Sequence, residues 1–175
     1  MVSAVVLAAG ASTRFGSPKQ RVLLDEVLAR VRESSVSDVV VVTGAHPVET
    51  GARVVRCPEW ELGAGASLRC GLRELPLGVQ AAVVVLADGP DLAPKAIDRV
   101  IEVWRKSAAE VVAATYGGQR LHPVLLARPA WERIPVEGAR ELPGLLVACD
   151  DLDPPGDIDF ADDLPERFRP ETREE

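Results

Sequence analysis

Short runs of consecutive apolar residues recur along this chain of 175 residues, and they constrain its fold more than any other feature. The clearest runs are Ser3–Leu7, Val39–Thr43 and Ala81–Leu86, and each has the length of a strand buried on both faces. Segments with apolar residues at helical spacing lie between them. Strands that are apolar throughout and alternate with helices indicate a mostly parallel sheet covered on both faces. We therefore expect a Rossmann-like, three-layer α/β/α fold.

The other expected elements complete this pattern. We predict helices over Val22–Val31, Gly65–Leu75, Pro94 to about Lys106, and a short one over Pro129–Ile134. Further strands are predicted over Arg53–Arg56, Val111–Ala114, Pro123–Leu126 and Leu145–Cys149. Residues 1–164 are expected to form a single domain, and the polar, proline-containing segment 165–175 is expected to be frayed.

Composition and charge exclude several classes of partner. The formal net charge is −7 and there is no block of basic residues, which argues against nucleic acid as a partner. No apolar run is long enough to cross a bilayer, and the first run lacks the flanks of a secretion signal. The three cysteines, Cys57, Cys70 and Cys149, are scattered, which argues against a disulfide framework and for a reducing cytosol. We expect a cytoplasmic protein with no membrane segment.

The loop after the first strand is the main candidate site. Residues 8–19 read AAGASTRFGSPK, so small residues precede two cations, Arg14 and Lys19. Small residues let backbone N–H groups approach a ligand closely, and consecutive N–H groups bind anions. The spacing matches neither the Walker A pattern nor the dinucleotide fingerprint. From composition alone, an ordinary strand-to-helix turn with solvated charges is the alternative.

A second candidate loop follows the strand Ala81–Leu86. Ligands of open α/β sheets bind outside the carboxyl ends of the strands, which would bring this loop beside the first one. Asp88 is well placed there to bind Mg²⁺, a hard cation that prefers oxygen ligands. The alternative is a turn aspartate, which is common before glycine and proline.

The pattern L-A-A-G-x-S-x-R-x-G-x-x-K at residues 7–19 is similar to the signature of the MobA-like nucleotidyltransferases. Within that family it resembles the molybdenum cofactor cytidylyltransferase branch. Other stretches resemble family elements in the same order: Cys57-Pro58-Glu59-Trp60, Gly63, Ser67-Leu68 with Gly71, Ala87-Asp88-Gly89-Pro90, His122-Pro123-Val124, Gly138-Ala139-Arg140 and Asp157-Ile158-Asp159. The resemblance covers nearly the whole chain and implies a fold of the nucleotide-diphospho-sugar transferase type.

The resemblance also implies roles for individual residues. The nucleotide-binding set it implies is Leu7, Ala8, Ala9, Gly10, Ser12, Arg14, Lys19 and Ser67. Arg14 and Lys19 would also stabilise the transition state, and Asp88 would hold Mg²⁺. Either Asp157 or Asp159 would be the second metal ligand, and His122 would lie towards the acceptor. On residue type alone, Ser67 could instead cap a helix, the two aspartates could form a solvated face, and His122 could be structural.

The implied reaction moves a nucleoside monophosphate from a nucleoside triphosphate to a phosphorylated acceptor and releases pyrophosphate. In this branch the nucleotide is CTP, the acceptor is molybdopterin, and a molybdoenzyme would receive the product. Ala87, Leu121 and Val136 depart from the family pattern in the acceptor half. These departures leave open a sugar phosphate or alcohol phosphate as the acceptor. A nucleotide-binding module without turnover is a third hypothesis.

Overall fold

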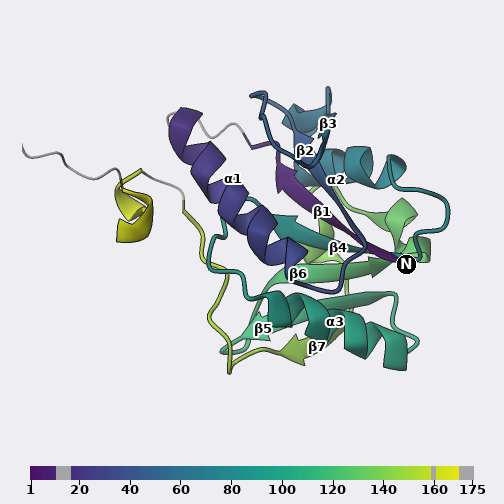
Figure 1. Ribbon diagram of the computed structural model, residues 1–175. Coiled ribbons are helices and arrows are strands. Elements are labelled where there is room, and N and C mark those ends of the chain that lie inside the picture. The colour runs from purple at the N-terminus through teal and green to yellow at the C-terminus, as the bar shows by residue number, and fades with distance from the viewer. Residues whose placement is uncertain (11–16, 159–160, 170–175) are drawn as a thin grey trace, which may run out of the picture.

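The core of the protein is a seven-stranded sheet (Figure 1) in a computed structural model that describes residues 1–10, 17–158 and 161–169. The strands are β1 (Val2–Ala8), β2 (Asp38–Thr43), β3 (Arg53–Arg56), β4 (Ala81–Leu86), β5 (Val111–Tyr116), β6 (Gln119–Ala127) and β7 (Leu145–Ala148). Their order is β3-β2-β1-β4-β6-β5-β7. Only β6 runs antiparallel to its neighbours, β4 and β5. The predicted, mostly parallel sheet is therefore confirmed.

Helices cover both faces of this sheet, as predicted for a three-layer α/β/α fold. Helices α1 (Ser17–Arg32) and α3 (Pro94–Lys106) pack on one face, and α2 (Ala64–Arg73) packs on the other (Figure 1). Leu28 and Ile97 share the first core cluster with Val83, whereas Leu68 shares the second with Val42. The alternating strand residues thus divide the core into two apolar layers, because successive side chains point to opposite faces.

Short 3₁₀ turns complete the fold around α2 and the C-terminal segment. They are η1 (Trp60–Leu62), η2 (Arg128–Arg133), η3 (Ala139–Glu141), η4 (Ala161–Asp163) and η5 (Glu166–Phe168). The short helix predicted over Pro129–Ile134 corresponds to η2. Both η2 and η3 contact β6, so they extend the layer that α2 begins.

The start of α1 differs from the sequence prediction. The helix begins at Ser17, not at Val22, so the backbone of Lys19 lies in the first helical turn and not in the preceding loop. Proline is tolerated in the first turn because its N–H group would have no helical partner there, and Pro18 occupies that turn. The buried side of α1 includes Leu23, Leu24 and Val27. Apolar periodicity therefore starts later than the helix does.

The prediction that the cysteines form no disulfide is wrong. Cys57 and Cys70 are joined by a disulfide bond, and Cys149 is a buried free thiol. Cys57 follows β3, and its backbone N–H group donates to the Thr43 carbonyl oxygen at 2.8 Å. Gly71 lets α2 lie against the sheet, because a Cβ atom there would lie 2.6 Å from a Val42 methyl group. Close packing of α2 brings the two cysteines together, and their sequence spacing does not reveal it. The cysteine spacing therefore no longer supports the inference of a reducing compartment.

The described part of the C-terminal segment is folded against the rest of the chain, although the sequence predicts fraying from residue 165. Leu164 is 2% exposed and packs with Leu23 of α1, and Phe168 joins this cluster. Arg167 forms an ion pair with Asp91 at 2.5 Å. Apolar residues within a mostly charged segment therefore anchor residues 164–169. Residues 170–175 lie outside the described part.

Candidate functional site

The two predicted loops meet at one edge of the sheet. Leu7 of β1 pairs with Leu86 of β4, and Ala8 pairs with Thr43 of β2. All three strands are parallel, so the segments that follow them leave the sheet together. The Ala87 N–H group donates to the Leu7 carbonyl oxygen at 3.0 Å. This hydrogen bond joins the loop of Asp88 directly to the end of β1.

Trp60 lies close to the end of β2 and to Ala9. A Cβ atom at Gly44 would lie 2.4 Å from Trp60 Cγ and 2.8 Å from the Ala9 carbonyl oxygen. No side chain fits at Gly44, because contacts below 3.0 Å would force the neighbouring atoms to move. The indole therefore rests on the backbone just beyond β2, beside Ala9.

The start of α2 is enclosed by the segment before η3. The Gly65 N–H group donates to the Val136 carbonyl oxygen at 2.9 Å, and a Cβ atom at Gly65 would lie 1.9 Å from the Pro135 carbonyl oxygen. The N-cap residue is Gly63, which has a φ of 122°. Ser67 lies further along α2 and is 3% exposed. The capping role considered for Ser67 is therefore excluded.

The Asp88 loop is held by the segment that carries the second metal-ligand candidates. The Ile158 N–H group donates to the Asp88 carbonyl oxygen at 3.1 Å, and the Asp91 N–H group donates to the Pro155 carbonyl oxygen at 3.0 Å. Asp157 is exposed and precedes Ile158 directly. In the part of the chain that the structure describes, no group of three or more His, Cys, Asp and Glu side chains is placed to hold a metal ion.

His122 is brought against the Asp88 loop by an irregularity in β6. Ala113 of β5 pairs with Val124 but Thr115 pairs with Arg120, so β6 carries extra residues over 121–123. Such bulges redirect side chains and occur next to active sites. A Cβ atom at Gly89 would lie 2.8 Å from His122 Nε2, so the imidazole packs on the backbone next to Asp88.

The environment of His122 keeps its ring neutral. The side chain is 8% exposed, and burial lowers its pKa to about 4 because desolvation disfavours the charged form. Its Nε2 atom is buried and has no hydrogen-bond partner among the described residues. At neutral pH the imidazole ring can donate a hydrogen bond to a ligand or accept one from it, but it supplies no positive charge.

The sequence reasoning missed Arg120. Its Nη2 donates to the Ala139 carbonyl oxygen at 3.1 Å, while Nε is buried without a hydrogen-bond partner among residues 1–10, 17–158 and 161–169. Burial lowers the pKa of its guanidinium group, and the charge of Glu141 acts in the opposite direction. An arginine just after a Gly-Gly turn resembles any exposed hairpin residue. Only its hydrogen bond to the Ala139 carbonyl oxygen and its buried Nε atom reveal the difference.

Several predicted site residues are only partly placed. Ser12 and Arg14 of the first loop and Asp159 lie outside the described residues. Lys19 has its backbone in α1, and its side chain is not described. Leu7 and Ala8 are half-buried, Ala9 is buried and Gly10 is exposed. The structure thus brings Leu7 to Gly10, Asp88 and His122 to one edge of the sheet, whereas the cationic part of the phosphate loop stays a prediction.

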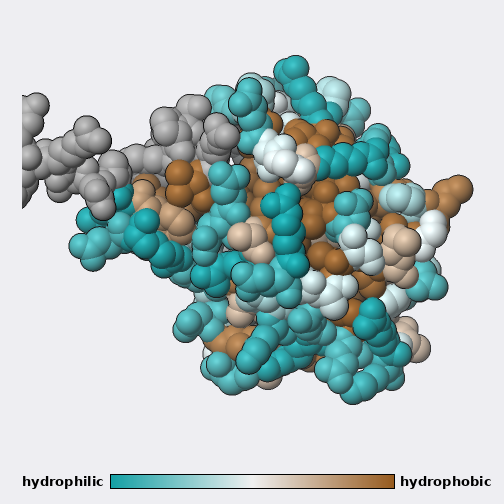
Figure 2. Space-filling model, viewed as in Figure 1, coloured by the Kyte–Doolittle hydropathy of each residue, from teal (hydrophilic) through white to brown (hydrophobic). Residues whose placement is uncertain are grey.

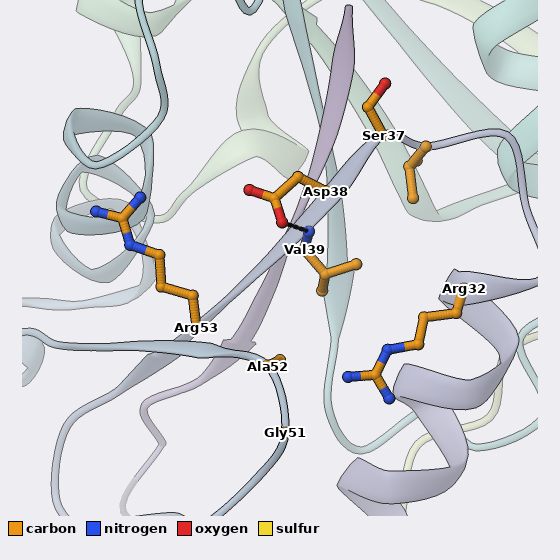
Figure 3. A pocket seen from close by; sticks show the side chains of 8 residues that line it. Arg32, Ser37, Asp38, Val39, Gly51, Ala52 and Arg53 are labelled. Carbon is orange, nitrogen blue, oxygen red and sulfur yellow. Dashed lines mark hydrogen bonds between the residues drawn. The ribbon is translucent and has the colours of Figure 1, made fainter.

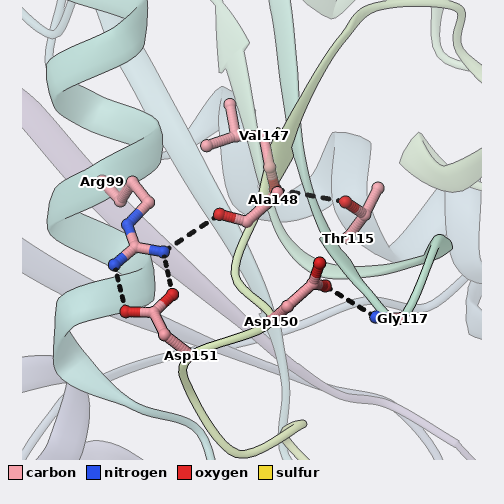
Figure 4. Close-up of polar contacts among 7 residues, drawn as sticks. All are labelled: Arg99, Thr115, Gly117, Val147, Ala148, Asp150 and Asp151. Atoms are coloured by element: carbon pink, nitrogen blue, oxygen red, sulfur yellow. Dashed lines mark hydrogen bonds and ion pairs between the residues drawn. The ribbon is translucent and has the colours of Figure 1, made fainter.

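Two other acids of the C-terminal half have structural partners (Figure 4). Arg99 of α3 donates to both carboxylate oxygens of Asp151, at 2.6 and 2.8 Å, and to the Ala148 carbonyl oxygen at 3.0 Å. The hydrogen bond from Arg99 lowers the pKa of Asp151 to about 2. The Gly117 N–H group donates to Asp150 Oδ1 at 2.7 Å. These contacts tie the end of β7 to α3 and to the turn between β5 and β6.

A hollow of about 290 Å³ lies away from this site, near the amino end of β2 (Figure 3). Its lining residues are Arg32, Val36, Ser37, Asp38, Val39, Gly51, Ala52 and Arg53. Asp38 Oδ1 accepts a hydrogen bond from the Val39 N–H group at 2.8 Å, and Arg53 forms an ion pair with Glu74 at 2.7 Å. Asp38 and Arg53 therefore already have partners within the protein.

The outer sides of α1 and α3 are largely hydrophilic (Figure 2). Among the helices that the structure describes, none combines the length and apolar character needed to cross a bilayer.

The fold defines an α/β protein in which the segments after β1 and β4 lie side by side at the carboxyl ends of the strands, the position where open α/β sheets bind ligands. The sequence model of the MobA-like NTP transferase domain matches residues 4–148. The chain belongs to this family, which confirms the resemblance seen in the sequence. Comparison with curated protein sequences gave no match.

Solved structures agree with this assignment. Rv0371c from Mycobacterium tuberculosis H37Rv is 27% identical, with a TM-score of 0.75 over 92% of this chain and 93% of that chain. Rv0371c in complex with manganese is 23% identical, with a TM-score of 0.65 over 84% and 87% of the two chains. A nucleotidyl transferase from Methanothermobacter is 21% identical, with a TM-score of 0.61 over 76% and 74%. The last two support the fold alone.

Proposed function

We propose that this chain transfers a nucleoside monophosphate from CTP to the phosphate group of molybdopterin and releases pyrophosphate. Family membership supports nucleotidyl transfer in general. The observation that carries the proposal is the hydrogen bond from Ala87 to Leu7, because it fixes the Asp88 loop beside the small-residue loop after β1. A carboxylate and a backbone anion site side by side suit a metal-bound triphosphate.

Two described carboxylates, Asp88 and Asp157, support a divalent metal ion between the segments that carry them. Asp88 lies just beyond the end of β4, and Asp157 precedes the residue that bonds to the Asp88 backbone. Carboxylate oxygens are the ligands that Mg²⁺ and Mn²⁺ prefer, and the related Rv0371c is known in complex with manganese. We propose Mg²⁺ held by Asp88 with Asp157 or Asp159. When bound, the ion neutralises charge on the phosphate oxygens.

The chain's own residues would bind and align the reacting groups. An oxygen of the acceptor phosphate forms the new bond to the α-phosphorus, and the bond to the pyrophosphate oxygen breaks. The attacking phosphate is already an anion, so no general base is needed. The barrier is mainly alignment and charge repulsion. Backbone groups of Ala8–Gly10, with Arg14 and Lys19, would hold the triphosphate and the departing pyrophosphate, and Trp60 and Ser67 would enclose the nucleotide.

A sugar phosphate or alcohol phosphate is the second candidate for the acceptor. Val136 stands where the family pattern has an acid, and it is 59% exposed beside the start of α2. Leu121 does not bear on this choice, because it packs against the core layer of α1 and α3 on the other face. The exposed apolar side chain of Val136, where the family pattern has a carboxylate, is the feature that favours a different acceptor.

Pyrophosphate release tests the proposal. The protein is incubated with Mg²⁺ and each of the four nucleoside triphosphates, with molybdopterin, with a sugar phosphate, or with no acceptor. Release that requires CTP and molybdopterin supports the first choice. Release only with the sugar phosphate supports the second candidate. Nucleotide binding without release under any condition would identify a binding module and sink both transfer reactions.

A further inference from the structure

Arg120 stands apart from the other described arginines that approach acids. Arg30, Arg53, Arg99, Arg133 and Arg167 each form an ion pair with a carboxylate. Arg120 forms none with a described residue, although its Nε atom is buried. The charge of Glu141 acts on the guanidinium group but supplies no acceptor to Nε, and a buried donor without an acceptor is costly. A bound anion would supply the missing partner.

The position of Arg120 directs this charge towards the site. It pairs with Thr115 at the start of β6, and β6 is antiparallel to β4. The first residues of β6 therefore lie at the edge of the sheet where β1 and β4 end. The guanidinium group donates a hydrogen bond to the Ala139 carbonyl oxygen. The neighbouring Gly138 packs on the start of α2, because a Cβ atom at Gly138 would lie 3.2 Å from the Ala64 Cβ atom.

A second buried nitrogen lies two residues away. His122 Nε2 also has no hydrogen-bond partner within the described chain, and its ring packs on Gly89. Buried polar groups in folded proteins are nearly always hydrogen-bonded. An anion with several acceptor oxygens would supply a partner to each of these two nitrogens. A phosphate monoester is such an anion.

The sheet order separates this position from the nucleotide's phosphates. Strand β4 lies between β1 and β6, and neighbouring strands are about 4.8 Å apart. The loop after β1, Asp88 after β4, and Arg120 on β6 thus follow one another along the edge. An in-line displacement needs the attacking oxygen and the leaving oxygen on opposite sides of the α-phosphorus, so an acceptor phosphate on the far side of Asp88 from the loop after β1 suits this reaction.

We propose that Arg120, together with His122 two residues further along β6, binds the phosphate monoester of the acceptor and presents it for attack. This inference rests on the proposed nucleotidyl transfer, and it adds a residue that selects phosphorylated acceptors. Arg120 supplies the charge and the fork of N–H donors, and neutral His122 supplies one further hydrogen bond.

Calorimetric titration of the full chain with inorganic phosphate tests this assignment. Phosphate also has a second expected position in the loop before α1, so the titration is made in a Lys19→Ala background. In that background Arg120→Gln should weaken phosphate binding by about 10- to 100-fold, the range for a hydrogen bond to a charged group. Arg120→Lys should restore part of the affinity. Arg105→Gln removes an exposed charge of α3 and should change nothing.

Two results would overturn the proposal. One is phosphate binding that is equal with and without Arg120→Gln, and the other is no phosphate binding to the wild-type chain at millimolar concentration. Circular dichroism and the melting temperature of each variant establish that it is folded. A separate titration with CTP and Mg²⁺ reports on nucleotide binding. Its failure would count against the proposed function while the Arg120 result could still be interpreted.

Discussion

The two halves of the site are held in different ways. On the side of β1 and β2, glycines allow the backbone to pack closely against other groups. Gly44 lies against the Trp60 ring, and Gly65 lies against the Pro135 carbonyl oxygen. On the side of β6, the site contains two buried side-chain nitrogens, Arg120 Nε and His122 Nε2. The first half contains the family pattern of residues 7–19, which the sequence shows directly, whereas the burial of Arg120 Nε is not visible in the sequence. The first half was therefore predicted in more detail than the second.

The largest expected effect falls between the halves, at Asp88. Asp88→Asn keeps the size of the side chain and removes its charge, so Mg²⁺-dependent pyrophosphate release should fall roughly 10²- to 10³-fold, the range for losing one electrostatic contact in a transition state. The melting temperature should stay within a few degrees. Full activity in this variant would remove Asp88 from the site.

The disulfide tests how the nucleotide half is held. Cys57 and Cys70 enclose the segment that carries Trp60 and Ser67. Because the cross-link restricts the unfolded chain, Cys70→Ser should lower the free energy of unfolding by about 3 kcal/mol, as expected for a loop of this length. Urea denaturation measures the change. Reductant should destabilise the wild-type chain similarly and leave Cys70→Ser unaffected; an equal response in both would contradict the pairing.

His122 gives the acceptor half a pH dependence. Burial holds its pKa at about 4 in the folded protein, against about 6.5 in the unfolded chain. The unfolded state therefore binds the proton first as the pH falls, and stability is lost between about pH 6.5 and 4. In the His122→Gln variant, the fall in unfolding free energy on acidification should be about 2–3 kcal/mol smaller than in the wild-type protein. Unfolding free energies of both proteins at pH 7 and 4.5 give the difference, and parallel curves would refute a buried neutral ring.

Gly65 tests backbone packing at the start of α2. Gly65→Ala places a Cβ atom where the Pro135 carbonyl oxygen now lies 1.9 Å away, and the resulting overpacking should cost about 2 kcal/mol. Gly78→Ala is the matched control, because no atom lies within 4 Å of its Cβ position. Equal unfolding midpoints for the two variants would show that the close approach is not a constraint.

The sequence predicted the fold in most of its elements because the buried strands are continuously apolar. Arg53–Arg56 and Ala81–Leu86 have the predicted bounds. The start of α1 was missed because its first turn is polar, and the disulfide because tertiary packing alone brings Cys57 to Cys70. At the site, Asp88 follows a recognisable strand. Arg120 could not be found, because what distinguishes it is a tertiary hydrogen bond to the Ala139 carbonyl oxygen, 19 residues away.

The smallest expected effect concerns the ion pair that joins the C-terminal segment to the Asp88 loop. Arg167 and Asp91 are both substantially exposed, at 46% and 39%, and exposed pairs contribute roughly 0–1 kcal/mol. Arg167→Gln should therefore change the unfolding free energy by less than about 1 kcal/mol, and the change should shrink further in 1 M salt. Asp91→Asn should have the same effect, and the two changes together should add nothing. A loss of several kcal/mol would mean that this pair, and not the apolar contact of Leu164 with Leu23, fixes the segment against the acceptor half.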